Sequence, residues 1–233
     1  LGASKEIATA ESPEAKFNLN PEQCISEDIE AINTTIPGSY PTSSGACAGE
    51  VNYDWQVKKP SFSDFLPVSL LNPSWVVGDD LLIPASDVDE VGCWEIKLIA
   101  VNPAACLAES VYTDTVNVED IPDADFNDIG DICQNEQITL TDASNIIEAT
   151  CDPTLPNETP TYVWAVSPNS GYVLGNDSDG NPTSLNSQNP VITFTEVGTY
   201  TVDLTVTTEC GSDTHSETFD VLGNPTVAFP IAS

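Results

Sequence analysis

A five-residue motif of the form P-x-(A/V)-x-F occurs three times in this chain. The copies occupy residues 13–17, 122–126 and 225–229, at intervals of 109 and 103 residues. An immunoglobulin-like sandwich domain has about 100 residues, so both intervals match one such domain. The chain is therefore predicted to contain two complete tandem repeats.

Further residues keep the same spacing. The offset of 109 places Cys24 on Cys133 and Trp55 on Trp164, and a shorter offset of 106 places residues 91–98 on 197–204. Because loop lengths differ between repeats while these positions stay matched, we take the repeats as structural units. The expected divisions are the end of a preceding repeat, a first repeat, a second repeat and the start of a third, at residues 1–12, 13–121, 122–222 and 223–233.

The matched blocks alternate apolar and polar residues with a period of two, as in Tyr162/Trp164 and Tyr200/Val202. This alternation is typical of strands with one buried face. No long stretch has helical periodicity, and residues 85–90 could form one helical turn at most. We expect an all-β fold of tandem immunoglobulin-like sandwiches in an extended array.

The net charge is -32, from 37 acidic residues and five lysines. Such a surface repels nucleic acid and anionic lipid, which are excluded as partners. No apolar run approaches the roughly 18 residues that span a bilayer. The second repeat has 17 acidic residues from 123 to 222 and no Lys or Arg. Solubility with mutual repulsion of neighbouring stalks, a specific cation, and a halophilic origin all remain open as explanations.

Seven cysteines indicate an oxidising environment, and the chain has neither an initiator Met nor a signal peptide. We expect an interior piece of a mature secreted protein.

The positions of the cysteines relative to the expected strands suggest their pairing. We expect Cys24 to open the second strand (B) and Cys93 to open the sixth (F), at one end of the first sandwich. Cys47 and Cys106 would lie at the other end. The expected disulfides are therefore Cys24 with Cys93, Cys47 with Cys106 and, in the second repeat, Cys151 with Cys210. Cys133 has Thr199 where its partner should be, so it is expected to be a free, inert and partly buried thiol.

Three segments together resemble the polycystic-kidney-disease (PKD)-type immunoglobulin-like repeats of Bacteroidetes cell-surface adhesins. They are residues 133–144 (CQNEQITLTDAS), 162–164 (YVW) and 197–202 (VGTYTV), which lead to residues 210–214 (CGSDT). The chain departs from the family because it lacks the Gly-Asp-Gly turn after the third strand (C). Residues 58–90 of the first repeat also do not align.

This resemblance implies stalk or spacer repeats of a surface filament that is exported by the type IX secretion system. It implies an extracellular, outer-membrane-associated location and a role in attachment and gliding motility. The implied partners are neighbouring repeats and a surface polysaccharide or substratum. Two alternatives are a carbohydrate-binding module, which requires exposed aromatics within 58–90, and a spacer of a secreted polysaccharide hydrolase.

No catalytic constellation is predicted, and we expect no enzyme activity. The only histidine is His215, which aligns with Tyr112, and it shares an extended strand with Ser212 and Asp213. Neighbours on a strand point to alternate faces and cannot form a relay.

A weak calcium candidate is the run 176–181 (NDSDGN), in which Asp177 and Asp179 would supply carboxylate oxygens. The alternative is a plain Gly/Asn turn. Two weaker candidates are the pair Asp79-Asp80 and the group Asp87/Asp89/Glu90. Zinc is not expected, since the chain has one His and mostly paired cysteines.

Trp55 and Trp164 are expected in the core, because this strand position packs the interior of such sandwiches. Trp75 has no equivalent in the second repeat and lies in the unaligned segment 58–90, so among the aromatic residues it is the best candidate for an exposed position. Asp114-Thr115-Val116 resembles a Bacteroidetes O-glycosylation signal, so Thr115 is a candidate for modification.

Overall fold

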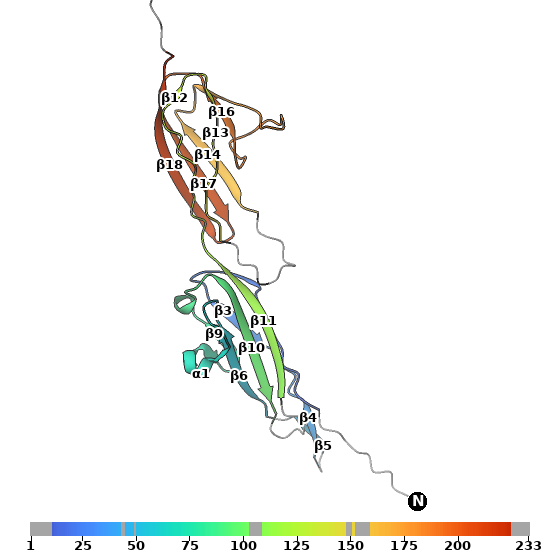
Figure 1. The fold of residues 1–233 in the computed structure, drawn as a ribbon. Helices are drawn as coiled ribbons and strands as arrows, with labels where there is room; N and C mark the ends of the chain where they lie inside the picture. The colour runs from blue at the N-terminus through green and yellow to red at the C-terminus, as the bar shows by residue number, and fades with distance from the viewer. Residues whose placement is uncertain are drawn as a thin grey trace, which may run out of the picture. The chain divides into compact units, whose positions relative to one another are not determined.

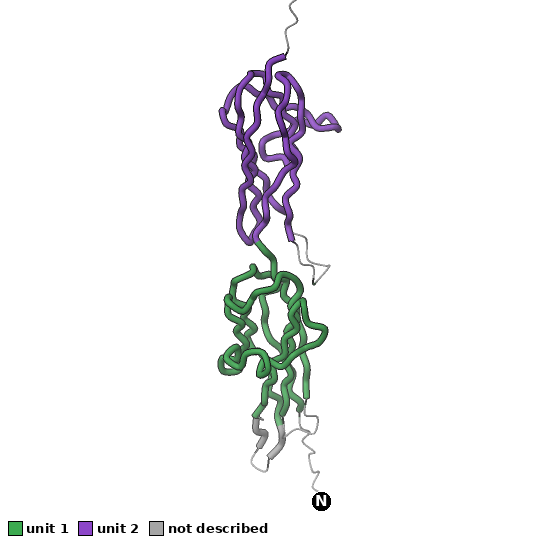
Figure 2. Tube along the Cα trace, turned by 60° about the vertical axis from the view of Figure 1, so that its left-hand side comes forward, with its two compact units in different colours: residues 1–120, 148–157 green, residues 121–147, 158–233 purple. Residues whose placement is uncertain are grey.

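The computed structural model describes residues 11–42, 45–48, 50–102, 109–147, 151 and 159–224. Two compact units are present (Figure 2). Unit 1 comprises Leu1–Asp120 and Glu148–Asn157, and unit 2 comprises Ile121–Ile147 and Glu158–Ser233. The sequence predicted a boundary one residue away, at 121/122. It did not predict that residues 148–157, which belong to the second repeat, group with unit 1.

Unit 1 is a sandwich of two sheets (Figure 1). One sheet has the order β1-β3-β9-β8, and the other has the order β2-β11-β10-β6-β7. The strands of the first sheet are β1 (Phe17–Leu19), β3 (Ile29–Asn33), β9 (Asp80–Ile83) and β8 (Val76–Val77). Those of the second are β2 (Glu22–Cys24), β11 (Glu109–Glu119), β10 (Gly92–Val101), β6 (Asn52–Lys58) and β7 (Leu66–Pro67). A separate hairpin consists of β4 (Ser39–Thr42) and β5 (Gly45–Ala48).

Unit 2 repeats this plan with fewer strands. One sheet has the order β12-β18-β17-β14, and a smaller sheet has the order β13-β16-β15. The strands of the larger sheet are β12 (Ile132–Cys133), β18 (Gly211–Leu222), β17 (Gly198–Thr208) and β14 (Thr161–Ser167). Those of the smaller are β13 (Gln137–Thr139), β16 (Val191–Phe194) and β15 (Tyr172–Leu174).

The strand order defines an immunoglobulin-like sandwich in each unit. In unit 1 the sequence of strands along the chain gives an A-B-E-D sheet facing a sheet built on C, F and G, as in immunoglobulin domains. In both units a short early strand pairs in parallel with the last strand, β2 with β11 and β12 with β18. The expected all-β immunoglobulin-like fold is confirmed within the part of the chain that the structure describes.

The recurring motif and the repeated tryptophan meet in each core. The ring centroids of Phe17 and Trp55 are 5.1 Å apart at an interplanar angle of 58°, and those of Phe126 and Trp164 are 5.1 Å apart at 57°. Each tryptophan is only 2% exposed. The indole N–H of Trp55 donates to the Asp79 carbonyl oxygen at 3.1 Å, and that of Trp164 to the Ser187 carbonyl oxygen at 3.1 Å. The core role expected for both tryptophans is confirmed.

Residues 59–90 distinguish unit 1, because they contain its short helices. These are α1 (Val68–Leu71), η1 (Pro73–Trp75) and η2 (Ala85–Asp87), the last being the single turn expected near residues 85–90. Trp75, the best candidate for an exposed aromatic residue, is instead buried, since it is 4% exposed in the core of unit 1. Its indole N–H donates to Asp87 Oδ2 at 2.7 Å, so its polar edge is satisfied while its rings are buried.

Candidate functional site

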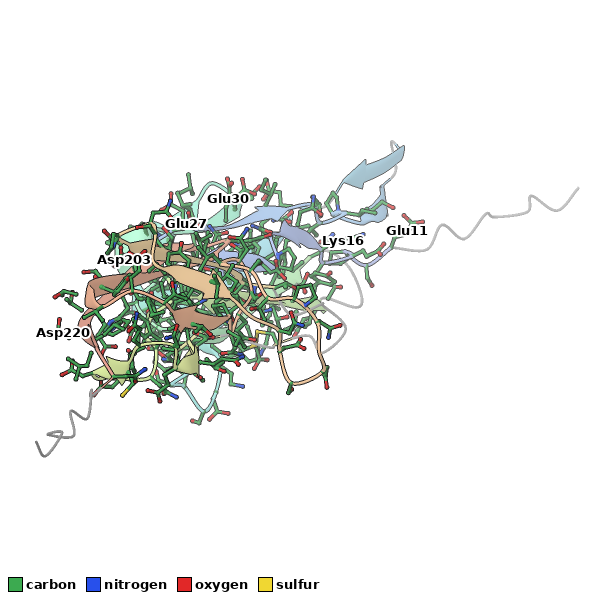
Figure 3. The ribbon with its side chains drawn as sticks, turned by 90° about the horizontal axis from the view of Figure 1, so that it is seen from above. Glu11, Lys16, Glu27, Glu30, Asp203 and Asp220 are labelled. Carbon is green, nitrogen blue, oxygen red and sulfur yellow. A yellow bond between two sulfur atoms is a disulfide. The ribbon has the colours of Figure 1, made fainter. Side chains whose placement is uncertain are left out.

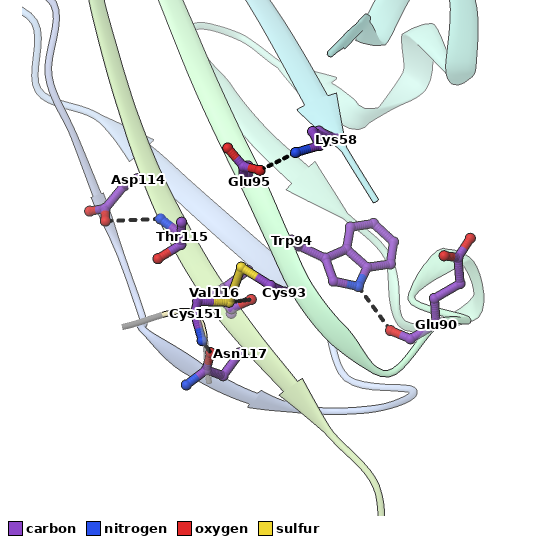
Figure 4. Close-up of a disulfide and its surroundings, with 10 residues drawn as sticks. All are labelled: Lys58, Glu90, Cys93, Trp94, Glu95, Asp114, Thr115, Val116, Asn117 and Cys151. Carbon is purple, nitrogen blue, oxygen red and sulfur yellow. Dashed lines mark hydrogen bonds and ion pairs between the residues drawn. A yellow bond between two sulfur atoms is a disulfide. The ribbon is translucent and has the colours of Figure 1, made fainter. Parts of the chain in front are cut away.

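A disulfide joins Cys93, the second residue of β10, to Cys151 (Figure 4). The two Cα atoms are 5.2 Å apart, and the residues are separated by 58 positions. Cys93 comes from the first repeat, whereas Cys151 precedes strand β14 of the second repeat. The bond therefore ties a segment of the second repeat to a strand of the first, within unit 1 as the structure divides the chain.

Asn117 holds Cys151 in place. It lies opposite Cys93 in the pairing of β10 with β11, and its side chain is 4% exposed. Its Oδ1 accepts a hydrogen bond of 2.7 Å from the backbone N–H of Cys151, while the Cys151 sulfur lies 3.5 Å from the Val116 carbonyl oxygen. A buried amide without a partner would cost free energy, so this contact satisfies Asn117 and fixes the backbone beside the bond (Figure 4).

This disulfide overturns two of the expected pairings. Cys24 is not the first residue of the second strand (B), as expected, but the last residue of β2, which pairs with β11. Strand β11 thus lies between Cys24 and Cys93, whose register partners are Glu119 and Asn117. Two strand spacings amount to about 10 Å, beyond the roughly 7 Å that a disulfide can bridge.

Cys151 cannot pair with Cys210, because it is bonded to Cys93. Cys24 and Cys210 are disulfide-bonded as well, although not to the partners that we expected. The expected bond between Cys47 and Cys106 lies outside the residues whose side chains the structure describes. The sequence contained one signal for this correction, which is the uneven distribution of cysteines between the two repeats. Cys151 has a counterpart in Cys47, whereas Cys93 corresponds to Thr199.

Cys133 is a free cysteine, and it is exposed rather than partly buried. It occupies the same turn as Cys24. In the first repeat the N–H of Cys24 donates to Glu27 Oε2 at 3.3 Å and the N–H of Glu27 donates to the Cys24 carbonyl at 3.1 Å. In the second, Cys133 and Glu136 exchange the equivalent bonds at 3.0 Å each. The two cysteines are structurally equivalent, but only Cys24 is bonded.

His215 packs in a structural position rather than a catalytic one. Its ring meets Phe126 edge-on with centroids 5.0 Å apart, as Tyr112 meets Phe17 at 5.0 Å. Its Nε2 lies 3.6 Å from Asp125 Oδ1, and Asp213 instead accepts the backbone N–H of Ala124 at 2.9 Å.

The loop that contains Asp177 and Asp179 closes on itself. The Asp177 carboxylate accepts backbone N–H groups from Asp179 at 3.0 Å and Asn181 at 2.8 Å, and the side-chain amide of Asn181 at 3.2 Å. The backbone N–H of Asn181 is the main cause of a pKa for Asp177 below its usual value. Gly180 has a φ of 84°, which a turn of this kind requires. The loop is a hydrogen-bonded turn, and the Asp177 oxygens already have partners.

The described residues contain no group of three or more His, Cys, Asp or Glu side chains placed to hold a metal ion. No helix in the part of the chain that is described is long and apolar enough to cross a membrane.

Two lysines contact residues of the 58–90 segment in unit 1. Lys59 Nζ lies 2.6 Å from Asp89 Oδ1 and 4.8 Å from the centre of the Trp94 ring. Lys97 Nζ lies 3.5 Å from the centre of the Phe65 ring. The hydrogen bond from Lys59 is the main cause of a lowered pKa for Asp89. Of the three aromatic residues of this segment, Phe62 and Phe65 are half-buried and Trp75 is buried.

The outward side of the β14-β17-β18 sheet in unit 2 is covered by hydroxyl groups. Thr201 and Thr218 form a cross-strand hydrogen bond of 2.9 Å, as do Thr205 and Thr214. Figure 3 labels acidic side chains of both units, among them Asp203 and Asp220 from this sheet. Thr115, the candidate for O-glycosylation, lies half-buried in the middle of β11, opposite Glu95.

A family model of the PKD domain matches residues 176–222, which include β16, β17 and β18. No curated protein matches the chain. The match and the immunoglobulin-like strand order together support a repeat of the PKD, immunoglobulin-like class.

Several solved multidomain structures are similar to this chain over most of its length. One is a Dscam structure on isoform specificity, with 12% identity, 91% of this chain and 46% of that chain covered, and a TM-score of 0.43. Another contains Sidekick-1 immunoglobulin domains 1–4, with 13% identity and a TM-score of 0.47. The match covers 94% of this chain and 51% of that chain. A third holds three N-terminal domains of the bacteriophage RB49 outer capsid protein Hoc, with 13% identity, coverage of 90% and 71%, and a TM-score of 0.42. The chain spans about half the length of the first two. We base the class of the fold on the strand order and the PKD match.

Proposed function

We propose that this chain consists of structural spacer repeats from an array in a secreted, surface-displayed bacterial adhesin or filament. The array separates a distal binding region from the cell and thereby serves attachment and gliding motility, with export by the type IX secretion system. Its partners are the neighbouring repeats, and the whole filament meets a surface polysaccharide or substratum. The repeats themselves have no catalytic role.

The disulfide between Cys93 and Cys151 is the observation that carries this proposal. It joins residues of consecutive repeats, so a pull along the chain is shared between the backbone from 93 to 151 and a covalent bypass of that segment. A bypass of this kind is useful in a protein under tension, because the bypassed residues cannot be drawn out to full length. Disulfides persist in oxidising compartments, which supports display outside the cytoplasm.

Surface labelling of intact cells tests the location. An antibody raised against residues 13–222 should label unpermeabilised cells, and added protease should remove the label. Labelling only after permeabilisation would contradict the proposal.

Replacement of the repeats tests the spacer role. In the parent protein, residues 13–222 are exchanged for two unrelated sandwich domains of equal length, or deleted. Exchange should preserve attachment to a substratum, since only length and stability matter, whereas deletion should weaken it. Loss of attachment in the exchanged strain would show that these repeats bind the ligand themselves.

The carbohydrate-binding alternative makes a different prediction. It needs an exposed aromatic platform, yet Phe62 and Phe65 are half-buried and Trp75 is buried. A glycan array probed with residues 1–233 should therefore give no signal. Specific binding would favour the alternative and would contradict a purely structural role.

A further inference from the structure

We propose that the open edge of strand β14 in unit 2 binds an extended segment of another polypeptide that is rich in lysine or arginine, and that this segment adds a strand to the sheet. Strand β14 is the last strand of the β12-β18-β17-β14 sheet, and among the strands that the structure describes it pairs only with β17 (Figure 1). Main-chain hydrogen bonding to an open sheet edge is a recurrent mode of peptide recognition. The proposal goes beyond the spacer role, because it assigns a partner to the second repeat.

The same edge is occupied in unit 1. There β6, the counterpart of β14, pairs on this edge with β7, which places Val57 opposite Leu66 and Gln56 opposite Pro67. The repeat offset of 109 matches Val57 with Val166. No strand in the described part of unit 2 takes the position of β7, so Val166 has no strand partner on this side within that part.

The backbone polar groups of Val166 point toward the open edge. In an antiparallel strand the N–H and C=O groups of successive residues point to opposite sides. The N–H of Trp164 donates to the carbonyl oxygen of Leu185, which lies in a turn, at 2.7 Å and not to β17. The backbone groups of Trp164, and of Val166 two residues later, therefore face away from β17. Val166 offers one donor and one acceptor to an incoming strand.

The sequence of β14 does not protect this edge. Natural proteins guard exposed sheet edges with charged side chains or proline. The segment TYVWAVS of β14 contains neither, whereas β6 includes Asp54 and Lys58 and β7 ends in Pro67. In addition, Val163 of β14 is 50% exposed. The edge is thus covered in unit 1 and open to pairing in unit 2.

Carboxylates on both sides of the edge favour a basic partner. Ala165 lies opposite Asp203 in the pairing of β14 with β17. Gln188 donates to Asp142 at 2.9 Å and to the Tyr162 hydroxyl at 3.2 Å, so Asp142 lies near the first residues of β14. The second repeat has no Lys or Arg to neutralise these groups. An added strand with lysine or arginine side chains is attracted to this site, whereas a second copy of the same acidic unit is repelled.

Hydrogen exchange of the Val166 amide, measured by NMR on residues 1–233, tests the proposal. The probe is the synthetic peptide acetyl-KVKVKVK-amide. The two control peptides are acetyl-EVEVEVE-amide and the lysine peptide with every backbone nitrogen methylated, which keeps its charge but cannot donate backbone hydrogen bonds. A saturating amount of the probe should slow exchange of Val166 by about tenfold or more. The amide of Val57, which already pairs with Leu66, should be unchanged.

Several outcomes would overturn the proposal. Unchanged exchange at Val166 would show that no strand is added. Equal protection by the methylated peptide or by the glutamate peptide would show that backbone pairing or charge plays no part. Protection of Val166 without peptide that increases with protein concentration would show that the edge pairs with a second copy.

A pair of lysine variants sharpens the test. Val163→Lys places a positive charge beside the edge and should weaken binding of the lysine peptide about threefold or more. Val111→Lys is the matched control, because Val111 is also 50% exposed but lies on β11, which is not the last strand of its sheet. It should leave the affinity unchanged. Equal weakening by both variants would show that the peptide responds only to net charge, and the assignment to β14 would fail.

Discussion

Units 1 and 2 each have a core of the same design, and they differ at the surface. Both place a phenylalanine of the recurring motif against a tryptophan at nearly identical distances and angles, and both cover that phenylalanine with an edge-on ring. The ring is Tyr112 in unit 1 and His215 in unit 2. The interior of a sandwich is close-packed, so few substitutions fit there, whereas solvent accepts almost any polar group. Sequence similarity between the repeats is therefore concentrated in the core.

The surface difference between the units is clearest on the outward face of the sheet that contains β10 in unit 1 and β17 in unit 2. In unit 1 this face contains charged pairs such as Lys58 and Glu95, which are 2.5 Å apart. In unit 2 the equivalent strands present threonine pairs joined by hydroxyl hydrogen bonds. The second repeat has no Lys or Arg at all, so it cannot form Lys or Arg ion pairs within itself. Neutral hydroxyl ladders join its strands without adding negative charge.

The strongest test of the shared core is removal of its tryptophan. Trp55→Ala and Trp164→Ala should each lower the free energy of unfolding of their own unit by about 3–5 kcal/mol, because each leaves a cavity and an unpaired carbonyl. Hydrogen exchange of β10 and β17, followed by mass spectrometry, reports on the two units separately. Val163→Ala, at an exposed site of β14, is the control and should have little effect. A cost below about 1 kcal/mol in either unit would show that the cores are not equivalent.

The second test concerns the cysteines. Removal of the 93–151 bond in the double variant Cys93→Ser/Cys151→Ser should destabilise unit 1 by about 4 kcal/mol, as the chain-entropy model gives for a loop of this length. Urea unfolding measured under oxidising conditions checks this value. Cys133→Ser in residues 1–233 is the matched control and should have little effect, since Cys133 is free there. Equal destabilisation by both variants would contradict the structure.

A smaller difference is expected where the motif meets the last strand. The N–H of Ala15 donates to the Ser110 hydroxyl at 3.0 Å, and that of Ala124 to the Asp213 carboxylate at 2.9 Å. Charge-assisted hydrogen bonds are stronger, so Asp213→Ala should cost about 1.5–3 kcal/mol and Ser110→Ala about 0.5–1.5 kcal/mol. Urea unfolding of each variant gives the order. A larger cost for Ser110→Ala would reverse this part of the comparison.

Lysine contacts occur in unit 1, and their expected contribution to the free energy of unfolding is smaller still. Lys59→Ala should lower stability by about 0.5–1 kcal/mol through loss of the Asp89 pair and the contact with Trp94, since the Asp89 side chain is exposed. The lowered pKa of Asp89 means that the pair stabilises above the ordinary carboxylate pKa and is lost as the pH falls through the folded-state value. Unfolding of the wild type and of Asp89→Asn from pH 3 to 7 measures this, and a wild-type advantage that persists at the lowest pH would argue against it.

The smallest expected effect is at Glu217, which occupies the position of Asp114. Burial raises the pKa of Glu217, and the neighbouring Asp128 adds to the shift, although Ile129 donates its N–H to the carboxylate at 3.2 Å. A raised pKa stabilises the fold below the unfolded-state pKa, and this contribution is lost as the pH rises through the folded-state pKa. Glu217→Gln should therefore flatten the pH dependence of unit 2 above the ordinary glutamate pKa. Thermal unfolding across this range is the measurement, and an unchanged slope would refute the assignment.

Several features of the fold were predictable from periodicity alone. The strands at residues 52–58, 161–167 and 198–208 and the buried positions of Trp55 and Trp164 follow from period-two alternation and from the repeat offset. His215 aligns with Tyr112, and in the structure each ring packs edge-on against the motif phenylalanine of its own unit. Local patterns give these results because a strand exposes alternate residues to alternate faces.

Trp75 and Cys24 mark the limits of such patterns. Trp75 is in a segment without a counterpart, and its burial depends on Asp87 accepting its N–H from twelve residues away. Cys24 was expected to open the second strand, but that strand, β3, begins five residues later at Ile29, and a strand boundary cannot be read this closely from an apolar run. Its true neighbour is the last strand of the unit, nearly a hundred residues further along the chain.

The sequence by itself determined the all-β class, the length of the repeat and core residues such as Trp55 and Trp164, since these depend on spacing and on side-chain polarity. Only the tertiary structure decided the disulfide partners. A disulfide requires two Cα atoms within a few ångströms, and this proximity depends on strand order and on the path of a loop from one repeat to the other, which no local pattern encodes. The bond between Cys93 and Cys151 joins positions that are separated by 58 residues in the sequence.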